Sequence, residues 1–138
     1  MARLLIVDDE KSLCQVLEIA FRKKGHLVET VLNGQSAKKK IESQVYDLII
    51  SDIRMPDLTG IELLEYARET HNPAAFILIT AVPSMSTAIT ALNLGAYDVL
   101  AKPFERKELI RSVSLAWLNW HHRRGCATSV ANALPAAS

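Results

Sequence analysis

The sequence Asp47-Leu48-Ile49-Ile50-Ser51-Asp52 places three large apolar residues in a row between two acids. A short apolar run without polar alternation is typical of a strand that is buried on both faces of a parallel sheet. Similar short runs occupy residues 4–7, 27–31, 76–79 and 98–101. We therefore expect five strands, and the run at residues 27–31 is the weakest of them.

Segments of helical length separate and follow these runs. Apolar residues recur at helical spacing within residues 11–24, 33–43, 59–67, 84–95 and 109–120. Asn33 is a typical helix N-cap, and Thr59 and Glu62 have the spacing of a capping box. Five strands that alternate with five helices indicate an α/β fold, a doubly wound parallel sheet with helices on both faces.

Composition limits the class of protein. A chain of 138 residues with 49% apolar and 22% charged residues is typical of one soluble globular domain. Its net charge of +1 gives no reason to expect a nucleic acid or a membrane as partner. The N-terminus lacks the long apolar region of a signal peptide, and Cys14 and Cys126 make no disulfide framework. We therefore expect a cytoplasmic protein.

Polar side chains follow four of the five expected strands, at the point where each strand ends. These residues are Asp8, Asp9, Asp52, Thr80 and Lys102. In a doubly wound sheet, ligands bind beyond the carboxyl ends of the strands. The sequence therefore predicts that these side chains form one site.

The residue types at this site indicate phosphoryl chemistry. Three carboxylates at one edge repel one another, so a cation is needed there, and Mg²⁺ is a cation that prefers such oxygen ligands. The ammonium of Lys102 suits a phosphoryl group or Asp52, and the hydroxyl of Thr80 can donate to a phosphate oxygen. An aspartate nucleophile with a metal ion, a lysine and a hydroxyl describes an acyl-phosphate site.

Four motifs stand in register with these strand ends. They are Val7-Asp8-Asp9-Glu10, Asp52-Ile53-Arg54-Met55-Pro56-Asp57-Leu58-Thr59-Gly60, Ile79-Thr80-Ala81 and Gly95-Ala96-Tyr97-Asp98-Val99-Leu100-Ala101-Lys102-Pro103-Phe104. Together they resemble the receiver domains of two-component response regulators, over about residues 3–121. The segment Ser86-Thr87-Ala88-Ile89 is also similar to receivers of the NtrC type.

The resemblance implies a flavodoxin-like (βα)5 fold with strand order 2-1-3-4-5. It implies that Asp52 accepts a phosphoryl group from a sensor histidine kinase, with Mg²⁺ or Mn²⁺ as cofactor. The implied metal ligands are Asp8, Asp9, Asp52 and the backbone carbonyl of Arg54, with Asp8 acting through a water molecule. Thr80 and Lys102 would contact the phosphoryl group, the Lys102–Pro103 peptide bond would be cis, and Gly60 would permit a tight chain path.

One residue departs from the family pattern. Three residues before the lysine, receivers usually carry a Tyr or Phe that turns inward on activation, and here that position is Val99. Phosphorylation should survive this change, because Val99 takes no part in the chemistry. We therefore expect a modified switch between Thr80 and the output surface.

Two alternatives belong to other functional classes. A phosphatase of the haloacid-dehalogenase class needs a second Asp two residues after its nucleophile, and Arg54 stands there instead. A degenerate receiver that acts only as a binding module should lack an acid, the Thr or the Lys, and none of these is missing. The resemblance thus implies a signalling phosphoacceptor that takes part in its own phosphorylation and slow autodephosphorylation, and not an enzyme.

The expected domain organisation is a receiver at residues 1–122 and a linker or tail at residues 123–138. NtrC-type regulators continue with ATPase and DNA-binding regions, which this sequence lacks. Whether the chain is a fragment or a single-domain regulator is left open. A homodimer is one expected partner state, and no direct contact of this domain with nucleic acid or membrane is expected.

Overall fold

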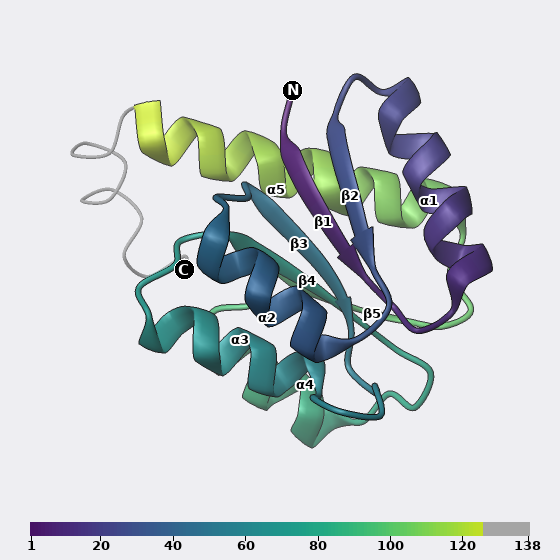
Figure 1. Ribbon diagram of the computed structural model, residues 1–138, viewed down its shortest axis with the longest axis vertical. Coiled ribbons are helices and arrows are strands. Elements are labelled where there is room, and N and C mark those ends of the chain that lie inside the picture. The colour runs from purple at the N-terminus through teal and green to yellow at the C-terminus, as the bar shows by residue number, and fades with distance from the viewer. Residues whose placement is uncertain (126–138) are drawn as a thin grey trace.

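The computed structural model describes residues 1–125 and contains one parallel sheet with the strand order β2-β1-β3-β4-β5 (Figure 1). Its strands are β1 (Arg3–Val7), β2 (Leu27–Val31), β3 (Leu48–Asp52), β4 (Ala75–Thr80) and β5 (Asp98–Ala101). Its helices are α1 (Lys11–Lys23), α2 (Gly34–Ser43), α3 (Gly60–Glu69), α4 (Met85–Asn93) and α5 (Arg106–Gly125). The predicted doubly wound (βα)5 fold is confirmed.

The sheet separates two hydrophobic cores. Helices α1 and α5 cover one face, and α2, α3 and α4 cover the other (Figure 1). Successive residues of a strand point to opposite faces, so Ile49 packs toward α3 while Ile50 packs toward α1 and α5. All five residues of β3 are buried, as expected for a strand inside a sheet that is covered on both sides.

The helices around the site begin where the sequence indicates. The side chain of Asn33 accepts a hydrogen bond from the Ser36 amide at the start of α2. Thr59 and Glu62 form a complete capping box at the start of α3. These caps satisfy backbone amides that have no partner inside a helix, and they fix where the chain turns after β2 and β3.

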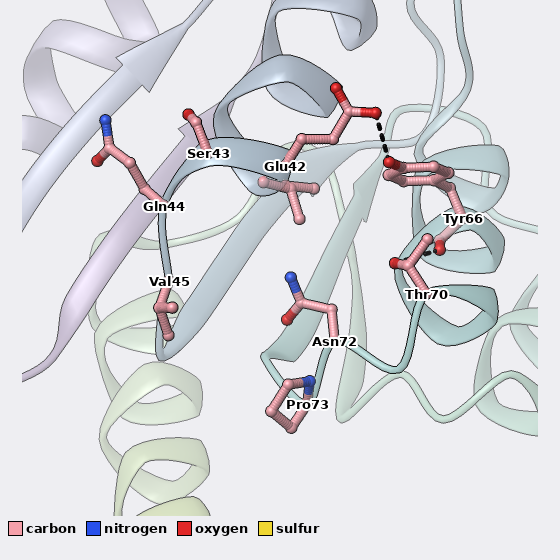
Figure 2. Close-up of a pocket in the computed structure, with 9 residues that line it drawn as sticks. Glu42, Ser43, Gln44, Val45, Tyr66, Thr70, Asn72 and Pro73 are labelled. Carbon is pink, nitrogen blue, oxygen red and sulfur yellow. Dashed lines mark hydrogen bonds between the residues drawn. The ribbon is translucent and has the colours of Figure 1, made fainter.

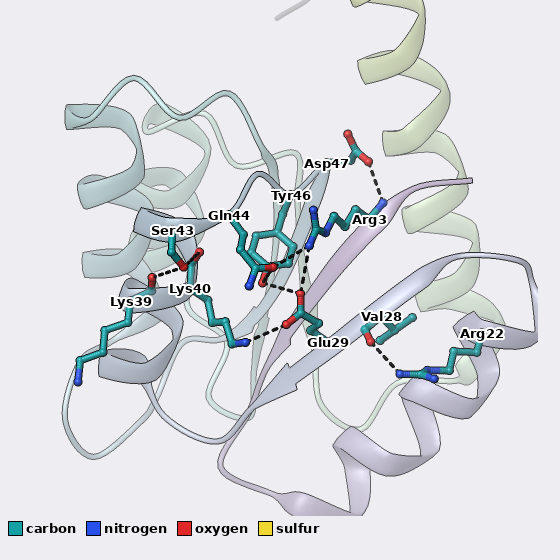
Figure 3. A network of polar contacts seen from close by, with 10 residues as sticks. All are labelled: Arg3, Arg22, Val28, Glu29, Lys39, Lys40, Ser43, Gln44, Tyr46 and Asp47. Carbon is teal, nitrogen blue, oxygen red and sulfur yellow. Dashed lines mark hydrogen bonds and ion pairs between the residues drawn. The ribbon is translucent and has the colours of Figure 1, made fainter.

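A polar network ties β2, an edge strand, to the rest of the sheet (Figure 3). Glu29 accepts a hydrogen bond from the Tyr46 hydroxyl at 2.9 Å and pairs with Lys40 at 2.9 Å. Arg3 lies 3.7 Å from the same carboxylate. Hydrogen bonding to Lys40 and Tyr46 lowers the pKa of Glu29. The carboxylate of Glu29 is therefore negatively charged beside the positive charges of Lys40 and Arg3. The network therefore joins β2 to Arg3 at the start of β1 and to Tyr46 just before β3. These amino ends of the strands lie away from the acids.

The last helix extends further than expected. It continues to Gly125, past the domain boundary expected at residue 122. The part of the expected tail at residues 126–138 lies outside the described residues. None of the helices within residues 1–125 has the length and apolar character that a bilayer span requires.

Candidate functional site

Three carboxylates meet at the carboxyl ends of β1 and β3. One ligand oxygen from each of Asp8, Asp9 and Asp52 lies within 4.8 Å of the others. Asp8 and Asp52 are buried, with 2% and 6% of their surface exposed, whereas Asp9 is exposed. This arrangement follows from the sheet order, because β1 and β3 are hydrogen-bonded neighbours, and Val7 at the end of β1 lies in register with Ser51, one residue before Asp52.

Lys102 supplies the only basic side chain that ion-pairs with this cluster in the described part of the chain. Its Nζ lies 3.0 Å from Oδ2 of Asp8 and 3.2 Å from Oδ2 of Asp52. Burial alone would lower the pKa of Lys102, but hydrogen bonds and charges from Asp8 and Asp52 outweigh burial and raise it. The lysine is therefore a fixed positive charge inside the site.

The electrostatic balance at Asp52 remains unfavourable despite this lysine. Desolvation and the neighbouring charge of Asp8 raise the pKa of Asp52, and Lys102 offsets only part of that effect. Two buried carboxylates therefore share one ammonium. A divalent cation with oxygen ligands would relieve the remaining repulsion, so the donor set fits a hard cation such as Mg²⁺.

Thr80 ends β4 and Lys102 follows β5, the next two strands of the sheet after β3. Thr80 is 3% exposed and accepts a hydrogen bond at its hydroxyl from the Val82 amide. The register of β4 with β3 places Asp52 opposite Ile79, one residue before Thr80. The Lys102–Pro103 peptide bond is cis.

The chain turns tightly after Asp52. The Arg54 amide donates to Oδ1 of Asp52 at 3.3 Å. At Gly60, a Cβ atom would lie 2.5 Å from the backbone oxygen of Asp52, so only glycine permits this close approach. The direction of the Arg54 carbonyl toward a metal ion remains an expectation.

Val99 lies on β5, three residues before Lys102, and is half-buried. It packs against the core beneath α2, α3 and α4 and lies opposite Leu78 of β4. Its side chain makes no polar contact with the acids, because it is a hydrocarbon. Its part in switching stays a prediction.

The site is distinct from a hollow elsewhere in the described part of the chain (Figure 2). That hollow has a volume of about 430 Å³ and lies where α2 and α3 end, at the opposite edge of the sheet. Its lining residues are Ile41, Glu42, Ser43, Gln44, Val45, Tyr66, Thr70, Asn72 and Pro73. Within this hollow the Tyr66 hydroxyl donates a hydrogen bond to the carboxylate of Glu42.

Comparisons with known proteins identify the family of this chain. The family model described as response regulator receiver domain matches residues 4–114. The transcriptional regulatory protein ZraR from Klebsiella oxytoca is 41% identical over 116 residues, which cover 82% of this chain and 26% of ZraR. The chain thus spans about a quarter to a half of the length of the curated relatives that it matches.

Two solved structures extend the comparison. The beryllofluoride-activated NtrC4 receiver domain dimer has a TM-score of 0.80 and 30% identity, covering 86% of this chain and 98% of that one. The response regulator TrrA from Thermotoga maritima, in complex with Mg²⁺ and BeF, has a TM-score of 0.75 and 33% identity, covering 84% and 99%. From the match of its sequence over residues 4–114 and of its fold, this chain belongs to the receiver domain family of two-component response regulators and is of the NtrC-like kind.

Proposed function

We propose that Asp52 is the phosphoacceptor of this receiver and that Mg²⁺ is its cofactor. The observation that carries the proposal is the position of Asp52, a buried carboxylate within 4.8 Å of Asp8 and Asp9 and 3.2 Å from Lys102. The Mg²⁺-bound structure of the related TrrA supports the choice of metal. Asp8, Asp9, Asp52 and the Arg54 carbonyl would hold the ion, which neutralises charge on the transferring group when bound.

The transfer itself is a nucleophilic displacement at phosphorus. A carboxylate oxygen of Asp52 forms a bond to phosphorus while the bond to the donor's histidine nitrogen breaks, and that nitrogen keeps the electron pair. Lys102 pairs with the phosphoryl oxygens, and the Thr80 hydroxyl donates to one of them. These residues mainly position and neutralise charge, as in other phosphoryl transfers.

The proposed output is a change at the surface from about Val82 to Lys102, which includes α4 and β5. A sensor histidine kinase is the proposed donor, and a second copy of the receiver is a proposed partner. Regulation of transcription is the proposed response, by analogy with ZraR. We propose residues 1–122 as the receiver unit and the cytoplasm as its location.

A phosphodonor experiment tests the acceptor. The protein is incubated with Mg²⁺ and acetyl phosphate and its intact mass is measured. We expect the mass of one phosphoryl group to be added to the wild type, and none to Asp52→Asn. Asp47→Asn is the matched control. Asp47 lies just before β3, at the end of the strand opposite to Asp52. An adduct that persists in Asp52→Asn would contradict the proposal, and many turnovers of phosphate release would indicate a phosphatase.

A further inference from the structure

The loop between β3 and α3, residues 53–59, carries Arg54 and is attached at its base by two backbone hydrogen bonds. The Ile53 amide donates to the Ile79 oxygen at 2.8 Å, and the Gly60 amide donates to the Ile53 oxygen at 2.8 Å. Both contacts lie next to the sheet. They leave the outer part of the loop to be fixed by something else.

Asp57, at the outer part of this loop, is bound to the first turn of α2. Its Oδ1 accepts a hydrogen bond from the Gly34 amide at 3.0 Å, and its Oδ2 accepts one from the Gln35 amide at 2.9 Å. Amides in the first turn have no partner inside a helix, and a carboxylate at this end also interacts favourably with the helix dipole. Hydrogen bonds from Gln35 and Gly34 lower the pKa of Asp57, so the carboxylate is charged at neutral pH.

A second contact shows that the loop lies directly on this helix. A Cβ atom at Gly34 would lie 2.5 Å from the Cβ of Leu58 and 2.8 Å from its backbone oxygen. Only a residue without a side chain permits that approach. The helix also has its own cap, because Asn33 accepts from the Ser36 amide at 2.8 Å. The Asp57 contact therefore does more than start the helix, since it joins the loop to α2.

We propose that Asp57 is a positioning residue for the metal site, a proposal that rests on the function proposed above. Arg54 lies three residues before Asp57 in the same loop, and its amide donates to Oδ1 of Asp52. Its carbonyl is the one proposed metal ligand that comes from backbone. Asp57 fixes the path of the loop against α2 and so holds that carbonyl in place. Helix α2 thereby sets the affinity for Mg²⁺ without contributing a ligand.

Mg²⁺ titration calorimetry on three variants of the full chain tests this role. Asp57→Ala removes both acceptors and with them the hydrogen bonds between the loop and α2. Asn33→Ala is the matched control, because it removes an acceptor from the same helical turn but leaves the loop attached. We expect Asp57→Ala to bind Mg²⁺ about tenfold more weakly, Asn33→Ala to bind like the wild type, and Asp57→Asn, which retains one acceptor oxygen, to lie between them.

The phosphorylation reaction gives a second readout. In Asp57→Ala the Mg²⁺ concentration for half-maximal adduct formation should rise by the same factor, and the adduct formed at saturating Mg²⁺ should equal that of the wild type. Wild-type affinity in Asp57→Ala, or an equal loss in Asn33→Ala, overturns the proposal. Where Asp57→Ala does not fold, Asp57→Asn against Asn33→Ala decides between the same outcomes. A wild type that binds Mg²⁺ but accepts no phosphoryl group refutes the proposed function, while the calorimetry still decides the role of Asp57.

Discussion

The ammonium of Lys102 lies 3.2 Å from Oδ2 of Asp52, although 50 residues separate them in sequence and β4 lies between their strands. The same ammonium lies 3.0 Å from Asp8, so one lysine serves two buried acids. The stability of the domain and the reactivity of its acceptor are therefore linked at this one cation.

Replacing Lys102 by Ala should destabilise the domain. The change leaves the buried charges of Asp8 and Asp52 without a positive counter-charge, and we expect the free energy of unfolding at neutral pH to fall by about 3 kcal/mol. Urea denaturation measures the loss. Saturating Mg²⁺ should restore part of it, because the cation neutralises the same acids.

Lys107→Ala is the control for that loss. Lys107 is exposed on α5 and should change the free energy of unfolding by less than about 0.5 kcal/mol. Equal stability of Lys102→Ala and wild type without Mg²⁺ would show that the ion pairs contribute nothing.

Asp52→Asn should make the domain more stable at neutral pH. Since burial and Asp8 raise the pKa of Asp52 in the folded state, folding favours its protonated form. That contribution to stability is present at low pH and is lost as pH rises through the raised pKa. The amide removes this cost, so the melting temperature of Asp52→Asn at pH 7 should be higher by about 4 °C.

The difference in melting temperature between Asp52→Asn and the wild type should depend on pH, which checks this explanation. The gain should shrink as pH falls through the raised pKa and should vanish at about pH 3, about one unit below the unfolded-state pKa of about 3.9, where the wild-type carboxylate is protonated in both states. Thermal denaturation of both proteins across this range measures it. A gain that is constant with pH would indicate a cause other than titration of Asp52.

Cys14 should be nearly inert in the folded protein. Burial and the charge of Asp8 raise the pKa of its thiol to about 11, and its Sγ lies 3.4 Å from the backbone oxygen of Asp8. The thiolate is the reactive form, so labelling below that pKa should be slower by about 100-fold than for an ordinary thiol. Labelling of a Cys126→Ser variant by a disulfide reagent, with and without urea, measures Cys14 alone, and equal rates would refute the burial argument.

Arg68 should be essential for the packing of the α4–β5 connection. Its guanidinium donates to the backbone oxygens of Asn72, Ala74, Leu94 and Gly95. Lysine cannot reproduce this planar set of donors, so we expect both Arg68→Ala and Arg68→Lys to lower the free energy of unfolding, by about 3 and 2 kcal/mol. Urea denaturation measures both, and a Lys variant as stable as wild type would contradict the role assigned to the fork geometry.

Val99→Ala should leave phosphorylation intact. Val99 packs in the core and has no polar atom in its side chain, so we expect the rate of adduct formation to stay within about twofold of wild type. The intact-mass assay measures the rate. A tenfold loss would show that the side chain at this position acts on the chemistry.

The sequence was sufficient for those features that depend on local pattern. Continuous apolar runs predict the buried strands. The polar residues at the strand ends predict the site, because the carboxyl ends of parallel strands meet at one edge of the sheet. The helix caps at Asn33 and Thr59 also follow from local spacing. Strand order does not follow from pattern alone and came from the family resemblance.

Contacts between distant residues of ordinary type could not be predicted. Asp57 reads as a loop acid, and nothing near it indicates that it binds amides 22 and 23 residues earlier. Arg68 reads as the end of an amphipathic helix, although its partners include oxygens 26 and 27 residues later. Val16 fits the apolar period of α1 and is nevertheless 43% exposed, because the period does not reveal how far a neighbouring element extends over it.

The strand order also places the two charged partners of the site at different positions in the sheet. Asp52 ends β3, which is hydrogen-bonded to β1 and β4, whereas Lys102 follows β5, which has a neighbour on one side only. An edge strand has half of its backbone groups free of the sheet and is easier to displace than an interior strand. The proposed acceptor thus stands on an interior strand, and its counter-charge follows an edge strand. We therefore expect new negative charge at Asp52 to displace β5 more readily than β3.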